Sequence, residues 1–250
     1  WLEQRGPLPI DLAVEFVLQA CVAVADAHAL GIVHRDLKPA NFFCVRRSDG
    51  ELAIKVLDFG ISKVTGGDLL RHGMSMTRTN AIMGSPLYMS PEQLRSPKEV
   101  DAQSDIWAIG ASLYELLTGR VPFEGESIAE LAVKLATEPP PRLRGLPEIP
   151  AGLEAVVLKC LERDRGMRYR NVAELAVALV EFAPKRGRVQ VERISAILRT
   201  TGQGTGTSDS APSGPALAQS GEGTTPAVGG WSNEVGENLG IWPHEGGDWQ

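Results

Sequence analysis

Apolar side chains recur three and four positions apart over residues 11–30, as they do on one face of an amphipathic helix. Asp11 stands where the N-cap of such a helix is expected, and Gly31 stands where the helix would stop. The pattern therefore predicts a helix over residues 11–30 that leads directly into a polar stretch.

Two short runs rich in β-branched and aromatic residues follow, at 42–45 and 52–59. The string RRSDG between them contains the pair Asp49-Gly50, which favours a tight turn. These features predict a β-hairpin. Residues 60–100 show no sustained period and are rich in Gly, Ser, Thr and Met. We expect a long loop there, and loops of that length inside a compact domain are usually functional.

Helical periodicity returns after this loop. The string DIWAIGASLYELLTG is apolar almost all round, which predicts a buried central helix over residues 104–119. Further helices are predicted at 127–136, 151–162, 171–182 and 189–198. The pattern as a whole predicts a mostly helical α+β domain with one small hairpin and one long loop.

Charge divides the 250-residue chain into two parts. Its 25 basic and 31 acidic side chains give a net charge of −6, and every Lys and Arg lies at or before Arg199. Residues 200–250 hold six acids, so residues 1–199 carry 25 basic and 25 acidic groups, a net of zero. The last segment also holds 12 of the 27 glycines. We expect a globular domain over 1–199 and a disordered, acidic tail over 200–250.

The composition disfavours several classes of protein. A neutral domain with an acidic tail does not predict a nucleic-acid binder, which usually carries a basic surface. Three widely spaced cysteines, Cys21, Cys44 and Cys160, indicate neither a disulfide framework nor a zinc cluster, and they favour a reducing, cytoplasmic setting. No stretch approaches 18 uninterrupted apolar residues, so no membrane span is predicted.

Three short strings point to chemistry. HRDLKPAN occupies residues 34–41, DFG occupies 58–60 and SPE occupies 90–92. In this order and spacing they resemble the catalytic loop, the metal-binding triplet and the end of the activation segment of protein kinases. SPE stands where APE is usual, which is a mild departure. A single triplet occurs by chance, whereas the joint arrangement is specific.

The resemblance implies a role for each of four residues. Asp36 would accept the proton of a substrate hydroxyl, and Lys38 would place its ammonium near the transferring phosphate of ATP. Asn41 and Asp58 would hold Mg²⁺ through oxygen ligands. The string LKPAN around Lys38 resembles the serine/threonine-specific form of the loop. The implied partners are protein substrates, together with a second copy of the chain in an autophosphorylation dimer.

Other matching positions imply support for the structure. Asp105 would accept hydrogen bonds from the catalytic-loop backbone, and Arg168 would form an ion pair with Glu92. His34 would be a packing and hydrogen-bonding residue of the loop, while His28 is interpreted as a helix-end residue. None of these side chains would act on the substrate.

The loop after DFG would carry regulation. In kinases with an arginine before the catalytic aspartate, here Arg35, that arginine commonly orders the loop by pairing with a phosphorylated residue. Thr77 and Thr79 are the candidate phosphosites by position, and the alternative is that both are ordinary loop threonines. Ser85 matches a family position that contacts the catalytic Asp and Lys.

The resemblance covers residues 1–185, the large lobe of a kinase domain. Neither a G-x-G-x-x-G string nor a strand lysine in a V-A-I-K context precedes His34. We therefore expect the N-terminal lobe to be absent and the chain, which starts at Trp1, to be a truncated bacterial serine/threonine kinase. The alternative is a non-catalytic scaffold that uses the substrate groove. In many relatives such a tail leads to a membrane helix or sensor domain.

The tail carries three of the five tryptophans, Trp231, Trp242 and Trp249. They are interpreted either as docking anchors, because Trp is favoured at binding hot spots, or as the product of a read-through or frameshifted end.

Overall fold

The computed structural model describes residues 2, 6–58, 85–96, 99–143 and 149–200. They belong to one compact unit, Trp1–Thr207. The predicted boundary at residue 199 falls one residue before the end of the last helix, at Thr200. The predicted disordered tail, with its three tryptophans, lies outside the described residues from 201 on.

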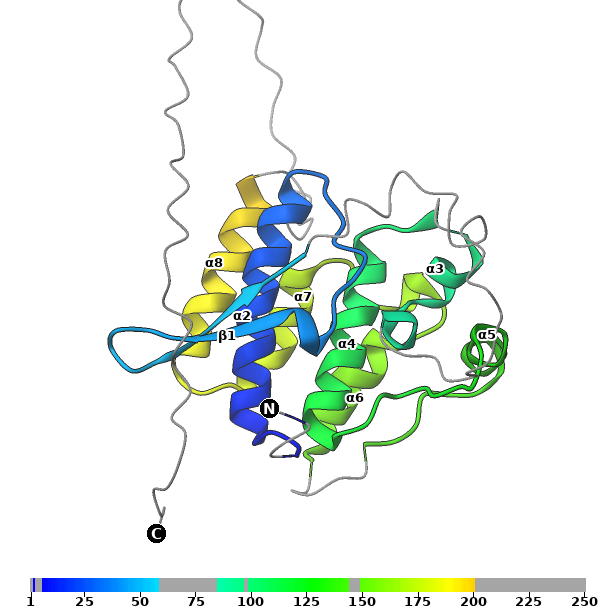
Figure 1. The fold of residues 1–250 in the computed structure, drawn as a ribbon. Coiled ribbons are helices and arrows are strands. Elements are labelled where there is room, and N and C mark those ends of the chain that lie inside the picture. Colours follow the sequence, from blue (N-terminus) through cyan, green and yellow to red (C-terminus); the bar gives the residue numbers. More distant parts are fainter. Residues whose placement is uncertain (1, 3–5, 59–84, 97–98, 144–148, 201–250) are drawn as a thin grey trace, which may run out of the picture. The chain divides into compact units, whose positions relative to one another are not determined.

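The described unit is mostly helical (Figure 1). Its α-helices are α2 (Ile10–Ala29), α3 (Pro91–Arg95), α4 (Ala102–Thr118), α5 (Ile128–Thr137), α6 (Ala151–Cys160), α7 (Val172–Leu179) and α8 (Gly187–Thr200). Its strands are β1 (Phe42–Arg46) and β2 (Leu52–Val56). Short 3₁₀ turns are η1 (Pro39–Asn41), η3 (Ser85–Tyr88), η5 (Arg165–Met167) and η6 (Val180–Phe182). In the described part of the chain, no helix is long and apolar enough to cross a membrane.

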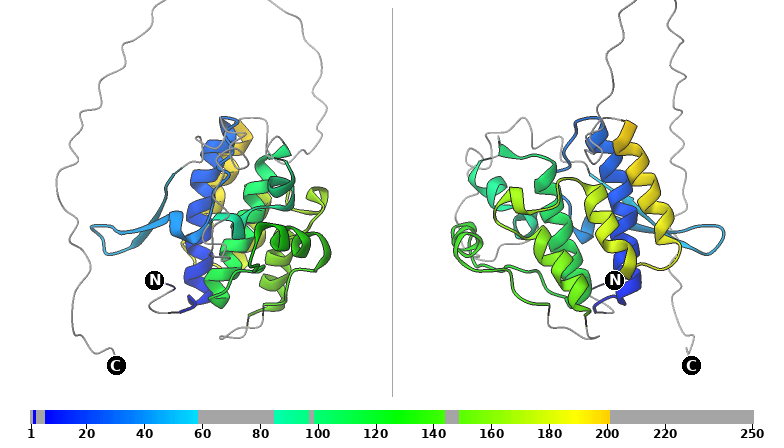
Figure 2. Two further views of the ribbon diagram at one scale, coloured as in Figure 1. Left: turned by 45° about the vertical axis from the view of Figure 1, so that its right-hand side comes forward. Right: turned by 180° about the vertical axis from the view of Figure 1, so that it is seen from behind.

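Helices α2 and α4 form the centre of the core. α2 contacts α4, α7 and α8, and α4 also packs on α6 (Figures 1 and 2). Trp107, Ile109 and Leu117 of α4 are almost completely buried. Each methylene that such side chains remove from water contributes about 0.8 kcal/mol, which is why α4 is apolar almost all round. The predicted central helix is confirmed.

The ends of these helices show which local signals were informative. α4 begins after the N-cap Asp101, whose side chain accepts from the N–H of Gln103, and ends at Gly119 with a φ of 73°. α2 has Pro9 as its N-cap, with no side-chain cap, so the prediction that Asp11 caps it is wrong. Asp11 lies in the first turn instead, where its carboxylate accepts from the N–H of Leu12.

The predicted hairpin is confirmed. β1 and β2 are antiparallel, and the register pairs Phe42 with Val56 and Arg46 with Leu52. β2 is shorter than the predicted run 52–59, because it ends at Val56. Antiparallel pairing therefore places the start of β1 beside the end of β2.

The segment predicted as a loop over 60–100 contains helical structure in its described part. α3 begins with a capping box, in which Ser90 accepts from the N–H of Gln93 and the Gln93 side chain accepts from the N–H of Ser90. Pro91 occupies the first helical position, where its missing N–H costs nothing. A helix of five residues is too short to show a period, so the loop prediction is wrong there.

Candidate active site

The backbone of the HRDLKPAN loop is held by one buried carboxylate. The N–H of His34 donates to Oδ2 of Asp105 at 2.8 Å, and the N–H of Arg35 donates to Oδ1 at 2.9 Å. Asp105 comes from the first turn of α4 and is completely buried. Because α4 lies in the buried core, it fixes the position of the loop. Asp105 thus makes the backbone contacts that the resemblance implies.

Asp36 follows this anchor and sits among polar partners. Nζ of Lys38 donates to Oδ2 of Asp36 at 3.3 Å, and the two side chains are 18% and 14% exposed. Nδ2 of Asn41 donates to the Asp36 carbonyl at 2.8 Å and reaches Oδ2 at 3.5 Å. The loop therefore brings together three of the four residues to which chemistry was assigned. The carboxylate of Asp36 is partly open to solvent, as a group that meets a substrate must be.

His34 joins the loop to the end of the hairpin. Its Nδ1 accepts the N–H of Asp36 at 3.3 Å, so its Nε2 carries the proton and donates to the Leu57 carbonyl at 3.1 Å. Burial lowers the pKa of His34, although Asp105 and the Leu57 carbonyl act in the opposite direction. A neutral imidazole with a single tautomer suits this pair of contacts.

The hairpin brings Asn41 and Asp58 to one end. Asn41 immediately precedes β1, Asp58 follows β2 by two residues, and the N–H of Leu57 donates to the Asn41 carbonyl at 2.9 Å. Asp58 is exposed and has a φ of 53°. Among the described residues, the non-glycine residues with positive φ are Asp58 and Arg35, at 67°. Such strained backbone persists where the surrounding structure enforces it, and it concentrates at functional sites.

The donor atoms at this end suit a hard cation. Nδ2 of Asn41 is used as a donor to Asp36, which leaves the amide oxygen for a metal. Asp58 adds an exposed carboxylate. Within the described ranges, no group of three or more His, Cys, Asp and Glu side chains could hold a metal ion. Two protein oxygens fit Mg²⁺ bound together with nucleotide phosphates and water, the usual arrangement for this ion.

Glu92 and Arg168 form a buried ion pair. Nη1 and Nη2 of Arg168 donate to the two carboxylate oxygens of Glu92 at 2.7 and 3.0 Å, and the hydroxyl of Ser104 donates to Oε1 at 2.8 Å. Burial by itself would raise the pKa of Glu92, but Arg168 and Ser104 outweigh it and lower that pKa to about 2. The pair ties α3 to the turn before α7, as the resemblance implies.

Two contacts near the site were not predicted from the sequence. His28 in the last turn of α2 is buried, and its Nε2 lies 2.8 Å from Oδ2 of Asp105. Nε2 of Gln93 in α3 donates to the Arg35 carbonyl at 2.7 Å. His28 and Asp105 are 77 residues apart in the chain, and Gln93 and Arg35 are 58 apart. No local sequence pattern could have predicted either contact.

Some of the predicted site residues cannot be placed. Thr77 and Thr79 lie outside the described residues, as do Phe59 and Gly60 of the DFG triplet. Ser85 begins the turn η3, and its side chain is outside the description too.

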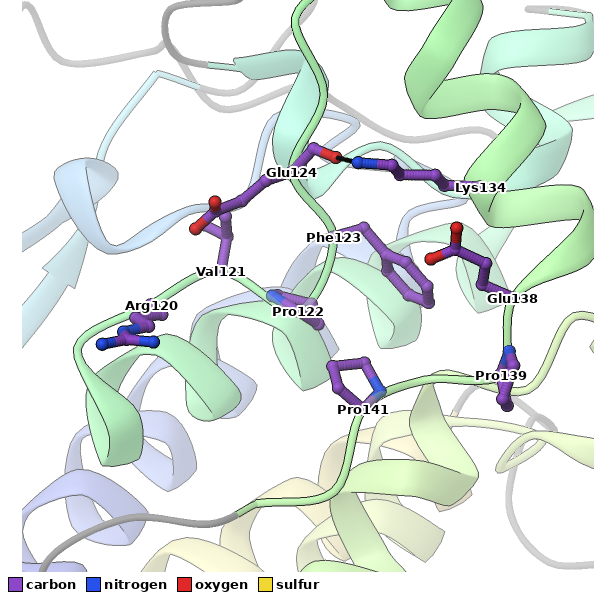
Figure 3. A pocket seen from close by; sticks show the side chains of 9 residues that line it. All are labelled: Arg120, Val121, Pro122, Phe123, Glu124, Lys134, Glu138, Pro139 and Pro141. Atoms are coloured by element: carbon purple, nitrogen blue, oxygen red, sulfur yellow. Dashed lines mark hydrogen bonds between the residues drawn. The ribbon is translucent and has the colours of Figure 1, made fainter.

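A separate pocket of about 300 Å³ lies between the end of α4 and helix α5 (Figure 3). Its lining includes Phe123, Pro141 and Lys134, whose Nζ donates to the Glu124 carbonyl. None of the predicted site residues lines it. This pocket is therefore separate from the residues of the candidate site.

Comparison with known proteins identifies the family of the chain. The sequence model of the protein kinase domain matches residues 1–177. The chain is 39% identical over 188 residues to serine/threonine-protein kinase Pkn1 of Myxococcus xanthus, covering 75% of this chain and 26% of that protein. It is 35% identical over 237 residues to pkn3 of the same organism, with 94% and 42% covered.

A third relative comes from another group of bacteria. The chain is 42% identical over 176 residues to the probable serine/threonine-protein kinase PknB of Lactococcus lactis, covering 70% of this chain and 26% of that protein. The chain thus spans less than half the length of each of these curated relatives. From its fold, its loop and these relatives, the chain belongs to the protein kinase domain family, among bacterial serine/threonine kinases.

Proposed function

We propose that this chain carries the phosphoryl-transfer loop of a serine/threonine protein kinase, which moves the γ-phosphate of ATP to Ser and Thr hydroxyls of proteins. One observation carries the proposal: the half-buried Asp36 carboxylate lies within reach of Lys38 and Asn41 on a loop fixed by the buried Asp105. We further propose that residues 1–199 form the large lobe of the kinase and that residues 200–250 are a separate acidic tail.

Asp36 would orient the substrate hydroxyl and accept its proton. A positioned general base contributes about 10²- to 10⁴-fold to the rate. Lys38 is already oriented toward Asp36, so its ammonium would meet the phosphate that approaches the same hydroxyl.

Asn41 and Asp58 would hold Mg²⁺ through the Asn41 amide oxygen and the Asp58 carboxylate. When bound with ATP, Mg²⁺ neutralises the charge that develops on the phosphates during transfer. The residues' own part is to fix two oxygens at the hairpin end, through the hydrogen bond between Leu57 and the Asn41 carbonyl and the positive φ of Asp58.

We also propose that phosphorylation of Thr77 or Thr79 controls the enzyme. Arg35 would pair with the phosphate, and its backbone is already fixed by Asp105 and Gln93. A charge-assisted contact of this kind can order a loop.

The test is transfer of labelled phosphate from ATP to a generic basic protein by the full-length gene product. We expect label on Ser and Thr that depends on Mg²⁺ and is lost in Asp36→Asn, while the exposed α2 variant Asp26→Asn keeps it. Equal labelling by wild type and Asp36→Asn would refute the assignment of Asp36. Absence of labelling by a folded wild-type product would instead favour the scaffold alternative.

A further inference from the structure

A glutamine on α2 contacts the backbone of the strand that leads to Asp58. Oε1 of Gln19 accepts the N–H of Ile54 at 2.8 Å, and Nε2 of Gln19 donates to the Leu52 carbonyl at 3.4 Å. Figure 1 shows the hairpin lying across α2. Gln19 therefore contacts β2 at two points, one a donor and one an acceptor.

The hydrogen-bonding register of the hairpin explains why the N–H of Ile54 and the carbonyl of Leu52 are accessible to Gln19. The bonds from Leu57 to Asn41 and from Arg47 to Glu51 show which pairs exchange hydrogen bonds across the ladder. In an antiparallel ladder such pairs alternate with pairs that do not exchange them. By this alternation, the N–H of Ile54 and the carbonyl of Leu52 point away from β1. In the described part of the chain the sheet has two strands, so this outer edge has no strand partner.

The Gln19 amide takes the place of a third strand. A residue in a parallel neighbouring strand would donate to the carbonyl on one side of Ala53 and accept from the N–H on its other side. Gln19 makes this pair of bonds with Leu52 and Ile54. An isolated two-stranded hairpin is at best marginally stable, so a partner on its outer edge matters for its position.

A chain of contacts fixes the amide itself. The second hydrogen of Gln19 Nε2 donates to Oε1 of Glu15, which is one turn earlier and only 5% exposed. Arg186 binds Glu15 through Nε and through Nη2, the latter at 2.6 Å to Oε2. A flipped Gln19 amide would bring its oxygen against the Glu15 carboxylate and the Leu52 carbonyl, so one orientation is strongly favoured.

Arg186 also contacts the hairpin directly. Its Nη1 lies 2.8 Å from Oε2 of Glu51, which precedes β2. Arg186 immediately precedes α8, and this segment lies beyond residue 177, where the match to the protein kinase domain ends. Helix α8 packs along α2 (Figures 1 and 2). The contacts therefore run from the α8 end of the lobe, through α2, to the strand that carries Asp58.

We propose that Gln19 is a positioning residue for the metal site: its amide, oriented by Glu15 and Arg186, holds the outer edge of β2 and thereby fixes Asp58. Three residues separate Ile54 from Asp58, and the last of them, Leu57, is held by Asn41 and His34. Movement of β2 along α2 would displace this short segment and the carboxylate at its end. The inference rests on the proposed function of Asp58 in holding Mg²⁺.

The first test does not depend on phosphate transfer. Gln19→Met keeps the size of the side chain and removes both hydrogen bonds, and hydrogen exchange at the Ile54 amide is then measured residue by residue. We expect exchange about 3- to 10-fold faster, as the loss of one hydrogen bond implies. Gln19→Glu keeps an acceptor for Ile54 but sets a carboxylate oxygen against Glu15 and the Leu52 carbonyl, so it is expected to restore little of the protection. Asp26→Asn, on the same helix, is the matched control and is expected to leave exchange unchanged.

The second test measures the Mg²⁺ concentration that gives half-maximal phosphate transfer by the full-length gene product. We expect Gln19→Met to raise it at least about fivefold, because small misplacements of a catalytic group are costly, with the rate at saturating Mg²⁺ largely recovered. If Gln19→Met left hydrogen exchange at the Ile54 amide unchanged, the proposal that Gln19 holds the edge of β2 would be overturned. Faster exchange with an unchanged Mg²⁺ requirement would overturn the positioning role. A wild-type product that exchanges as expected but transfers no phosphate would refute the proposed function and, with it, the Mg²⁺ role of Gln19.

Discussion

Removal of Arg168 tests the buried ion pair most severely. In the folded chain Nε of Arg168 donates to the Glu162 carbonyl at 2.6 Å. Its two terminal nitrogens donate to the Glu92 carboxylate and to the carbonyls of Gln103 and Arg163. The guanidinium also lies 5.0 Å from the centre of the Trp107 ring. Arg168→Met leaves the Glu92 carboxylate, 3% exposed, without its cation.

The loss of one member of a buried ion pair costs about 3–5 kcal/mol of the free energy of unfolding. For a domain of this size we expect the melting temperature to fall on the order of 10 °C. Arg168→Lys should recover less than half of this loss, because an ammonium cannot reproduce the fork of donors. The double change Glu92→Met with Arg168→Met should cost less than the sum of the single changes, since no buried charge is then unpaired.

The assay is urea unfolding followed by far-ultraviolet circular dichroism, which reports the whole helical unit. Arg170→Met is the matched control: its side chain is 78% exposed and pairs with Glu174 one helical turn away. We expect this control to lose only about 0.3–0.5 kcal/mol. If Arg168→Met unfolded at the same urea concentration as the control, the stabilising role of the pair would be refuted.

Three further predictions concern pH, packing and regulation. The pKa of Glu92 in the folded chain, about 2, lies below its ordinary value of 4.5. The stability that ionised Glu92 contributes is therefore complete above about pH 4.5 and is lost as pH falls through 2. The difference in melting temperature between wild type and Glu92→Gln should narrow over that window. Gly110→Ala would place a Cβ that overlaps with Cβ of Cys160, so it should lower stability by about 1–3 kcal/mol, and an increased melting temperature would contradict this. Thr77→Ala combined with Thr79→Ala should lower phosphate transfer by the full-length product, and undiminished transfer would remove this loop from the regulatory account.

Much of the fold could be predicted from patterns within single elements. The hairpin and the helices after residue 100 were predictable because burial imposes a period of two on strands and of three to four on helices. The cap of α2 was not: Pro9, with its fixed φ, begins the helix, and the side chain of Asp11 bonds the next backbone N–H. α3 was missed because its five residues are specified by Ser90 and Gln93 at its start and show no period.

The candidate site divides in the same way. Asp36, Lys38 and Asn41 lie in one short string, so their proximity follows from the chain itself, and the hairpin register then brings Asp58 to Asn41. The residues that hold the loop and the hairpin come from distant helices. The contact of His28 with Asp105 and that of Gln19 with Ile54 depend on how the helices pack, which no local pattern records.

The central claim is that Asp36 acts on the substrate hydroxyl during transfer, and steady-state kinetics of the full-length gene product test it most directly. For Asp36→Asn, with a melting temperature close to wild type, we predict that kcat falls at least about 10²-fold. The KM for ATP should change less than about threefold, because Asn preserves the shape of the loop. A kcat that stays within a few-fold of wild type in this folded variant would contradict the account.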